Sequence, residues 1–160
     1  MFFAGNSTYL ATQQSYWSLQ EASLSPACIV VPESPQDVSE AVAIIAGIDS
    51  CHFAIKGQSH TPAPGFANIN YGVTIDMTKL NSVTVNADRT LASVGAGASW
   101  LQVYQYLDGL GLSVAGGRNG AVGVGGLTLG GGISYFAPRV GWTCDTVVNF
   151  QVCLTSSAHP

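Results

Sequence analysis

The chain has 160 residues, of which 47% are hydrophobic and 9% charged, and its net charge is −4 at pH 7. This composition excludes a disordered chain, and five cations are too few for a nucleic-acid-binding surface, which depends on Lys and Arg. No apolar run approaches the ~20 residues of a membrane span. We therefore expect one globular domain or part of one, with neither nucleic acid nor membrane as a partner.

Residues 1–27 are polar, with scattered aromatic side chains and little periodicity. We interpret them as an N-terminal segment in which Tyr16 and Trp17 pack on the domain, and we expect the domain itself over residues 28–160. No basic stretch followed by a long apolar run marks a signal peptide. The four cysteines have no C-x-x-C spacing and form no zinc pattern with the three histidines, so no metal site is predicted.

A strand–helix–strand unit is predicted between residues 28 and 56. Short apolar runs at 28–31 and 52–56 indicate strands. Between them, Ser34 is a helix N-cap, Pro35 the first helical residue and Gly47 the stop. The two strands should be parallel neighbours. Cys28 and Cys51 stand at their starts, so we expect either a disulfide or two buried thiols.

A polar turn follows the second predicted strand at residues 56–65, Lys-Gly-Gln-Ser-His-Thr-Pro-Ala-Pro-Gly. Lys56 is the first cation in the chain, Gly57 permits a sharp change of direction, and short hydrogen-bond donors flank His60. The carboxyl end of a parallel strand is where open α/β sheets bind ligands. The segment predicts an anion-binding turn, with an ordinary surface turn as the alternative.

The next elements are three short strands and a second helix. Strands are predicted at 73–76, 82–85 and 91–94, the last two forming a hairpin around residues 86–89. Ser99 caps a helix with one apolar face. The apolar face of this helix consists of Trp100, Val103, Tyr104 and Leu107. After the helix, alternating apolar residues predict a final strand at 146–154.

A glycine-rich stretch separates this helix from the final strand. Nine of the 17 residues at 116–132 are glycine, and valine and leucine alternate with them, which is not typical of a flexible linker. Backbone without side chains suits close approach to a flat ligand. The dinucleotide spacing G-x-G-x-x-G fails, because Thr128 occupies the sixth position after Gly123 and Gly125.

Four segments in this order, residues 56–60, 72–76, 94–97 and 123–132, resemble the FAD-binding half of the vanillyl-alcohol oxidase superfamily. The resemblance is closest to its fungal berberine-bridge-enzyme-like branch and extends from about Tyr16 to Leu154. It implies an α+β fold of the PCMH type, in which a small parallel βαβ subdomain accompanies a mainly antiparallel sheet subdomain with helices. It also implies FAD as cofactor and, in a full-length relative, oxidation of a hydroxyl or amine group of a small molecule or sugar, with oxygen as acceptor.

The resemblance implies that His60 matches the histidine joined covalently to the 8α-methyl group of FAD, a reaction suited to a neutral imidazole. The family's second anchor, a cysteine, is absent from residues 119–122, and Cys144 lies too far along the chain to replace it. Lys56, Arg118 and Arg139 would offset the pyrophosphate charge, unless their positions are coincidental. The predicted cofactor-binding residues are Lys56, Gly57, Gln58, Ser59, His60, Thr61, Gly117, Val122, Gly123, Gly125, Gly126, Leu127, Gly130, Gly131 and Val148.

No catalytic residue is assigned, because Asp76, Asp88 and Asp145 are better interpreted as strand-end or turn residues. The family's substrate domain and base lie beyond this sequence, so we expect an incomplete FAD-binding domain that meets a small-molecule substrate only in a full-length relative. The alternatives are a catalytically inert fragment that binds FAD weakly or not at all, and a glycine-rich structural or interaction domain. We expect an uncovered sheet edge and poor solubility. The sequence indicates no compartment, although such relatives are often secreted.

Overall fold

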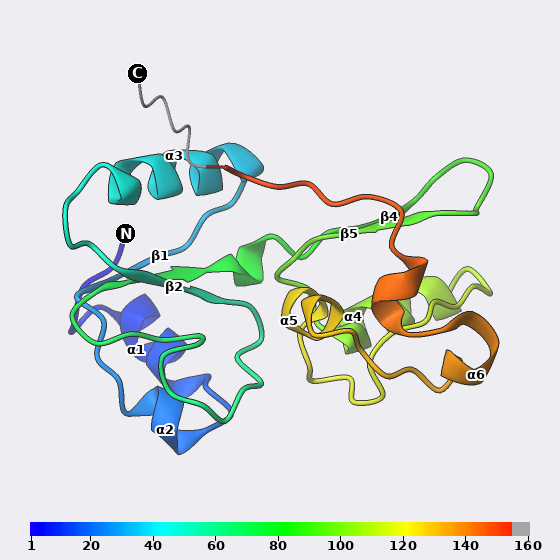
Figure 1. Cartoon of the computed structure of the whole chain (residues 1–160), viewed down its shortest axis with the longest axis horizontal. Helices are drawn as coiled ribbons and strands as arrows, with labels where there is room; N and C mark the ends of the chain where they lie inside the picture. Colours follow the sequence, from blue (N-terminus) through cyan, green and yellow to red (C-terminus); the bar gives the residue numbers. More distant parts are fainter. Residues whose placement is uncertain (155–160) are drawn as a thin grey trace. The chain divides into compact units, whose positions relative to one another are not determined.

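The computed structural model describes residues 1–154, which form two compact units (Figure 1). The first unit contains Met1–Lys56, Thr61–Met77 and residues 150–154, and the second contains Gly57–His60 and Thr78–Asn149. One unit carries a parallel sheet and the other a separate antiparallel sheet, each with helices, which confirms the expected α+β class. Residues 155–160, which the predicted domain includes, lie outside the described residues.

The sheet of the first unit has the strand order β1-β3-β2, with β1 at Cys28–Val30, β2 at Phe53–Lys56 and β3 at Val73–Asp76. Both outer strands run parallel to β3, so the predicted parallel direction is confirmed. Their predicted adjacency is wrong, because β3 is inserted between them. Its Ile75 is fully buried and pairs with a residue on each side.

The inserted strand also decides the state of Cys28 and Cys51. Cys28 pairs in register with Val73 on one side of β3, and Cys51 precedes the strand on the other side. Two strand spacings of about 4.8 Å exceed the reach of a disulfide. Both cysteines are free, so the open choice between a disulfide and two thiols resolves to thiols. Burial, and secondarily the neighbouring Cys51, raises the pKa of the Cys28 thiol.

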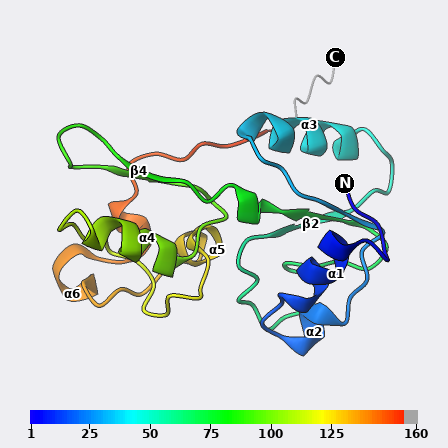
Figure 2. The same ribbon diagram turned by 180° about the vertical axis from the view of Figure 1, so that it is seen from behind.

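Helix α3 (Pro35–Ala46) covers one face of this sheet, and its predicted capping is confirmed (Figures 1 and 2). The Ser34 hydroxyl accepts from the Asp37 N–H, and the Asp37 carboxylate accepts from the N–H groups of Ser34 and Glu33. These bonds, led by the one from Glu33, lower the pKa of Asp37. Gly47 ends the helix, as expected. The buried face consists of Val38, Val42 and Ile45.

Two helices that the sequence analysis did not predict, α1 (Ser7–Gln14) and α2 (Leu19–Ala22), lie on the opposite face. Their helical spacing carries no apolar stripe, which explains why periodicity missed them. Tyr16 is buried, as expected, and its hydroxyl donates to the Ala67 carbonyl. Trp17 is 59% exposed, so it is covered much less than Tyr16.

The first unit buries several polar side chains beneath these helices. Lys56 and Asp76, at the carboxyl ends of β2 and β3, form an ion pair at 3.2 Å, and both are almost fully buried. The Thr12 hydroxyl of α1 donates to the same carboxylate at 3.1 Å, and the Lys56 ammonium lies 5.6 Å from the centre of the Tyr16 ring. Burial, followed by the charge of Asp76, raises the pKa of Tyr16.

A second polar cluster holds the loop that leads into β3. The fully buried Glu21 carboxylate accepts from the N–H groups of Phe66 and Ala67 at 3.0 and 2.8 Å. The buried Asn68 amide donates to the Glu21 carbonyl, and its oxygen accepts from the Thr74 hydroxyl. These bonds tie a loop without regular structure to α2 and to the centre of the sheet.

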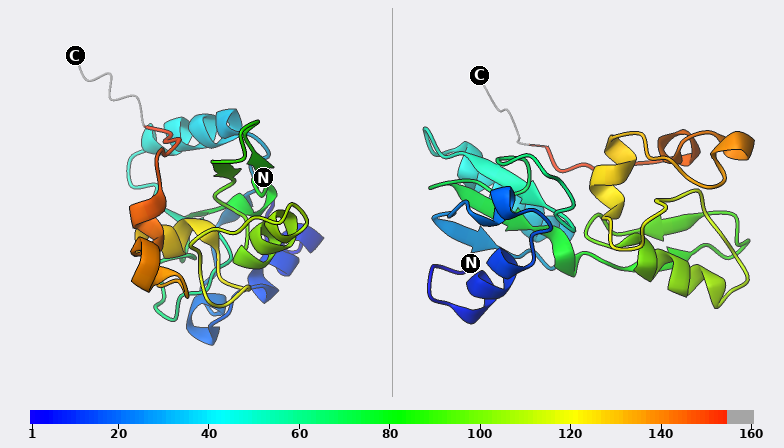
Figure 3. Two further views of the ribbon diagram at one scale, coloured as in Figure 1. Left: turned by 90° about the vertical axis from the view of Figure 1, so that its right-hand side faces the viewer. Right: turned by 90° about the horizontal axis from the view of Figure 1, so that it is seen from below.

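The second unit is built on the predicted hairpin and helix (Figure 3). Strands β4 (Val83–Val85) and β5 (Ala92–Val94) pair antiparallel. Helix α4 (Trp100–Asp108) packs on the hairpin, and Ser99 and Gln102 complete its capping box. Both predictions are confirmed. The core of this unit is a cluster of buried apolar residues, Ala98, Trp100, Val103 and Leu107.

The remaining elements are short helical turns: α5 (Val124–Leu129), α6 (Ala137–Val140) and the 3₁₀ turns η1 (Met77–Lys79) and η2 (Thr143–Thr146). The strand predicted at 146–154 is wrong, because no described strand pairs with residues 147–154. A strand requires a neighbour for its N–H and C=O groups. The alternation of apolar and polar residues indicates that a strand here would have two different faces. It does not show that a neighbouring strand is present. The exposed apolar side chains here are Val148, Phe150, Val152 and Leu154.

Candidate functional site

The turn that carries His60 belongs to the second unit, together with the glycine-rich stretch. Gly57, Gln58 and His60 are half-buried, and Ser59 is buried with a left-handed backbone at φ +52°. A serine in this region of φ/ψ space costs free energy and persists only where the surroundings hold it. The turn is therefore partly buried, and its backbone is held in a conformation that is unfavourable for serine.

Two other sequence motifs hold this turn. The side-chain amide of Gln58 donates to the Gly97 carbonyl at 2.7 Å. A Cβ placed on Gly123 would lie 3.0 Å from the Gln58 backbone nitrogen, and one on Gly125 would lie 3.0 Å from the Ala96 carbonyl oxygen. The structure thus brings together the histidine turn, the 95–98 loop and the start of the glycine-rich helix α5, which are far apart in the sequence.

Helix α5 begins without a side-chain cap, because its N-cap residue is Gly123. The Val124 N–H donates to the Ala98 carbonyl, and the Leu127 N–H donates to the Gly123 carbonyl. Among the described residues, the N–H groups of Gly125 and Gly126 have no acceptor. Gly126 is exposed, and a Cβ on it would meet nothing within 4 Å. This first turn therefore has two backbone donors that no described protein group accepts from, and such donors suit an anionic or carbonyl oxygen.

Other predicted cofactor-binding residues serve the core of the second unit. Gly117 is buried against the Trp100 ring, where a Cβ would lie 2.7 Å from the Trp100 Cδ1 atom, and its carbonyl accepts from the Tyr104 hydroxyl. Val122 and Leu127 pack against the same apolar cluster. Gly131 has φ +98° and faces the Trp142 ring. The resemblance assigned these four residues to a ligand, whereas their described contacts are with protein.

The remaining predicted residues are dispersed. Lys56 is buried and paired with Asp76 in the first unit, so its charge is already offset. Thr61, half-buried, also belongs to the first unit. Gly130 is exposed at the end of α5, and Val148 is 74% exposed in the extended segment. Of the two predicted arginines, both in the second unit, Arg118 is exposed and Arg139 lies in the last turn of α6.

The carboxylates considered as bases have structural roles, which agrees with their interpretation from sequence. Asp76 is buried in its ion pair. Asp145 accepts from the Trp142 N–H at 2.7 Å and helps form η2. Asp88 is exposed in the hairpin turn. These positions give none of the three a task in proton transfer, so no base is assigned.

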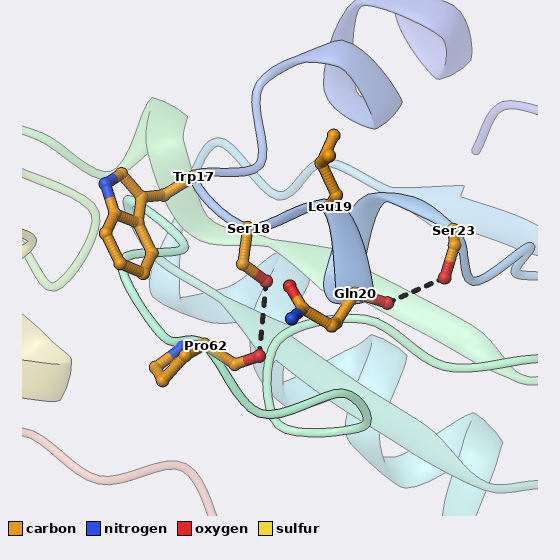
Figure 4. A pocket seen from close by; sticks show the side chains of 6 residues that line it. All are labelled: Trp17, Ser18, Leu19, Gln20, Ser23 and Pro62. Carbon is orange, nitrogen blue, oxygen red and sulfur yellow. Dashed lines mark hydrogen bonds between the residues drawn. The ribbon is translucent and has the colours of Figure 1, made fainter.

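A hollow of about 590 Å³ lies in the first unit beside α2 (Figure 4). The Ser18 hydroxyl donates across it to the Pro62 carbonyl at 3.3 Å. The hollow is lined by Trp17, Ser18, Leu19, Gln20, Ser23 and Pro62. None of these side chains is an acid or a base, so the hollow offers no acid–base chemistry. Within residues 1–154, no cluster of three metal-binding side chains occurs and no helix is long and apolar enough to span a membrane.

Ala96 and Gly97 are the residues of this site that the sequence analysis quoted as a motif without assigning a role. The Ala96 carbonyl faces Gly125, and the Gly97 carbonyl accepts from Gln58. The signal was the pair of glycines at 95 and 97 directly after β5. A Cβ on Gly95 would collide with the Leu80 carbonyl, so this glycine is required for the chain to pass.

Comparison with known proteins gives a family for this arrangement. Residues 26–157 match the family model described as an FAD binding domain. The chain is 44% identical over 141 residues to the FAD-dependent monooxygenase tpcD of Cochliobolus heterostrophus, covering 88% of this chain and 27% of the relative. The chain therefore spans less than a third of the length of this curated relative.

Two solved structures share the fold. The 6-hydroxy-D-nicotine oxidase of Arthrobacter nicotinovorans superimposes with a TM-score of 0.81 at 23% identity, over 90% of this chain and 31% of the oxidase. Berberine bridge enzyme in complex with (S)-reticuline superimposes with a TM-score of 0.79 at 21% identity, over 92% of this chain and 31% of the enzyme. The chain shares its fold with these two solved structures, and it belongs to the family of FAD binding domains.

Proposed function

We propose that this chain supplies the flavin-binding part of an oxidoreductase that acts on a hydroxyl or amine group of a small molecule or sugar. The observation that carries the proposal is the packing of the His60 turn against the 95–98 loop and the first turn of α5. This packing gathers the histidine turn and the backbone donors of α5 in one unit. FAD supplies the hydride-accepting ring when it is bound.

The residues of this unit fit the chemical parts of FAD. The N–H groups of Gly125 and Gly126 suit pyrophosphate oxygens, because donors at the start of a helix favour negative charge. The guanidinium groups of Arg118 and Arg139 add positive charge on the same unit. The buried Lys56 contributes less than the sequence suggested, since Asp76 already neutralises it.

His60 is proposed as the covalent attachment point. His60 follows Ser59, which has a left-handed backbone, and the turn that carries both is fastened to the 95–98 loop through Gln58. An imidazole nitrogen is nucleophilic when neutral, a state that histidine populates near neutral pH. Within residues 119–122 no cysteine occurs, so one covalent bond is proposed rather than two.

The direct experiment is a titration of the purified 160-residue protein with FAD, followed by flavin fluorescence and the visible spectrum. Binding predicts quenched or shifted flavin emission that saturates at one FAD per chain. A fragment that binds FAD without turnover gives the same saturation and no substrate oxidation. An unchanged flavin signal at all protein concentrations would contradict the proposal and favour a structural or interaction domain.

A further inference from the structure

We infer that Gly123 is a positioning residue for the histidine turn: its missing side chain makes room for the backbone of Gln58, and so sets the place of His60. This inference rests on the proposed attachment of flavin to His60. It differs from a role in which Gly123 lies bare so that the cofactor can approach it.

The first observation is the space beside Gly123. A Cβ on this residue would lie 3.0 Å from the Gln58 nitrogen, 3.1 Å from the Gln58 Cβ and 3.3 Å from its Cγ. All three nearest atoms belong to Gln58, and one of them is backbone, which cannot rotate away. Gly123 itself is buried. The volume that a side chain would need is therefore occupied by the protein's own turn.

The second observation is that both partners are fixed from their other sides. Gly123 forms an antiparallel bridge with Ser99, the Trp100 N–H donates to the Val122 carbonyl, and the Val124 N–H donates to the Ala98 carbonyl. Gln58 is fastened by its side-chain bond to the Gly97 carbonyl. Because the 122–124 segment is tied to the core of the unit, the displacement caused by an added methyl group falls on the turn.

The third observation removes backbone strain as an explanation. Gly123 has φ −74° and ψ 145°, an extended conformation that alanine adopts freely. A Gly123→Ala substitution therefore acts through the contact with Gln58. Gly109 provides a matched control in the same unit, since it has φ −61° and ends α4. The atom nearest to a methyl group at this position would lie at an ordinary contact distance of 3.5 Å.

The test compares Gly123→Ala with Gly109→Ala in the whole chain, first without flavin. Apart from residues 122–124, which the substitution changes directly, two-dimensional ¹⁵N–¹H NMR should show the largest amide shift changes of Gly123→Ala at Gln58, Ser59 and His60. Gly109→Ala should leave these three amides in place. If the Gly123→Ala spectrum leaves the turn unchanged, the inference fails whatever the flavin does.

The second measurement uses FAD. Gly123→Ala should lower the fraction of acid-stable flavin about tenfold, while reversible FAD affinity, measured in a His60→Ala background, changes less than about threefold. An equal loss of reversible affinity would overturn the inference and assign Gly123 to direct flavin contact. If the turn moves in the NMR spectra but no variant, including the unsubstituted protein, binds FAD, the positioning role stands and the proposed function fails.

Discussion

Both units bury apolar side chains, and they differ in what else their interiors contain. The first encloses charge and amide groups: the Lys56–Asp76 ion pair, the Glu21 carboxylate and the Asn68 amide are all almost fully buried. The second encloses apolar side chains around Trp100 and lets backbone approach backbone at its glycines. The first unit should therefore be sensitive to atoms that are removed, and the second to atoms that are added.

The difference follows from what each interior can tolerate. A buried polar group stabilises a fold only while its partners remain, because an unpaired one keeps the full cost of desolvation. A close backbone contact at a glycine contains no hydrogen bond that a substitution could remove. A single added methyl group, however, has no free space and must displace its neighbours. Each rule predicts a substitution whose effect on stability distinguishes one unit from the other.

The largest expected effect is in the first unit. Asp76→Ala removes the carboxylate that pairs with the buried Lys56 ammonium, and breaking a buried pair from one side costs about 3–5 kcal/mol of the free energy of unfolding. Urea denaturation measures it. Replacing both residues, as Lys56→Met with Asp76→Leu, should cost clearly less, since no charge stays behind. A double variant less stable than Asp76→Ala would show that the pair itself is strongly stabilising.

The next effect is in the second unit. Gly116→Ala puts a methyl group against the Trp100 ring and 2.7 Å from the Tyr104 hydroxyl oxygen, so overpacking should cost about 1–3 kcal/mol. Gly109→Ala should be neutral or slightly stabilising by the same urea measurement, because its methyl group meets only ordinary contacts. Equal stability of the two variants would show that the second unit is not sensitive to atoms added at its close glycine contacts.

The smallest effect concerns pH and the cap of α3. The hydrogen bonds from Glu33 and Ser34 lower the pKa of Asp37 in the folded protein, so its contribution is present above the unfolded value of about 3.9. That contribution is lost as pH falls through the folded pKa. Asp37→Asn should therefore reduce the fall in thermal stability below about pH 4. An identical acid profile in both proteins would mean that the carboxylate does not stabilise the helix.

The sequence predicted elements where local rules dominate. The capping residues Ser34 and Ser99 located α3 and α4, and alternation located the β4–β5 hairpin. It did not predict the order β1-β3-β2, because strand order depends on tertiary packing that no local pattern records. It missed α1 for a related reason: a helix without an apolar stripe gains its stability from polar contacts such as that of Thr12 with Asp76.

The candidate site was predicted by resemblance more than by physical pattern. Gly123 and Gly125 were selected as special positions, yet sequence alone does not distinguish a glycine that faces a ligand from one that faces Gln58 or Ala96. Lys56 shows the same limit, since a cation beside a turn indicates a ligand-binding group until its buried partner is located. Contacts between distant segments decide both cases.

The central claim, that the His60 turn is a flavin attachment site, is tested most directly by mass spectrometry of peptides from FAD-treated protein. The account predicts that the peptide containing His60 carries the mass of FAD, and that His60→Ala abolishes acid-stable flavin. His52→Ala, which alters an exposed histidine in the first unit, should leave the attachment unchanged. Acid-stable flavin retained by His60→Ala, or found on another residue, would contradict the claim.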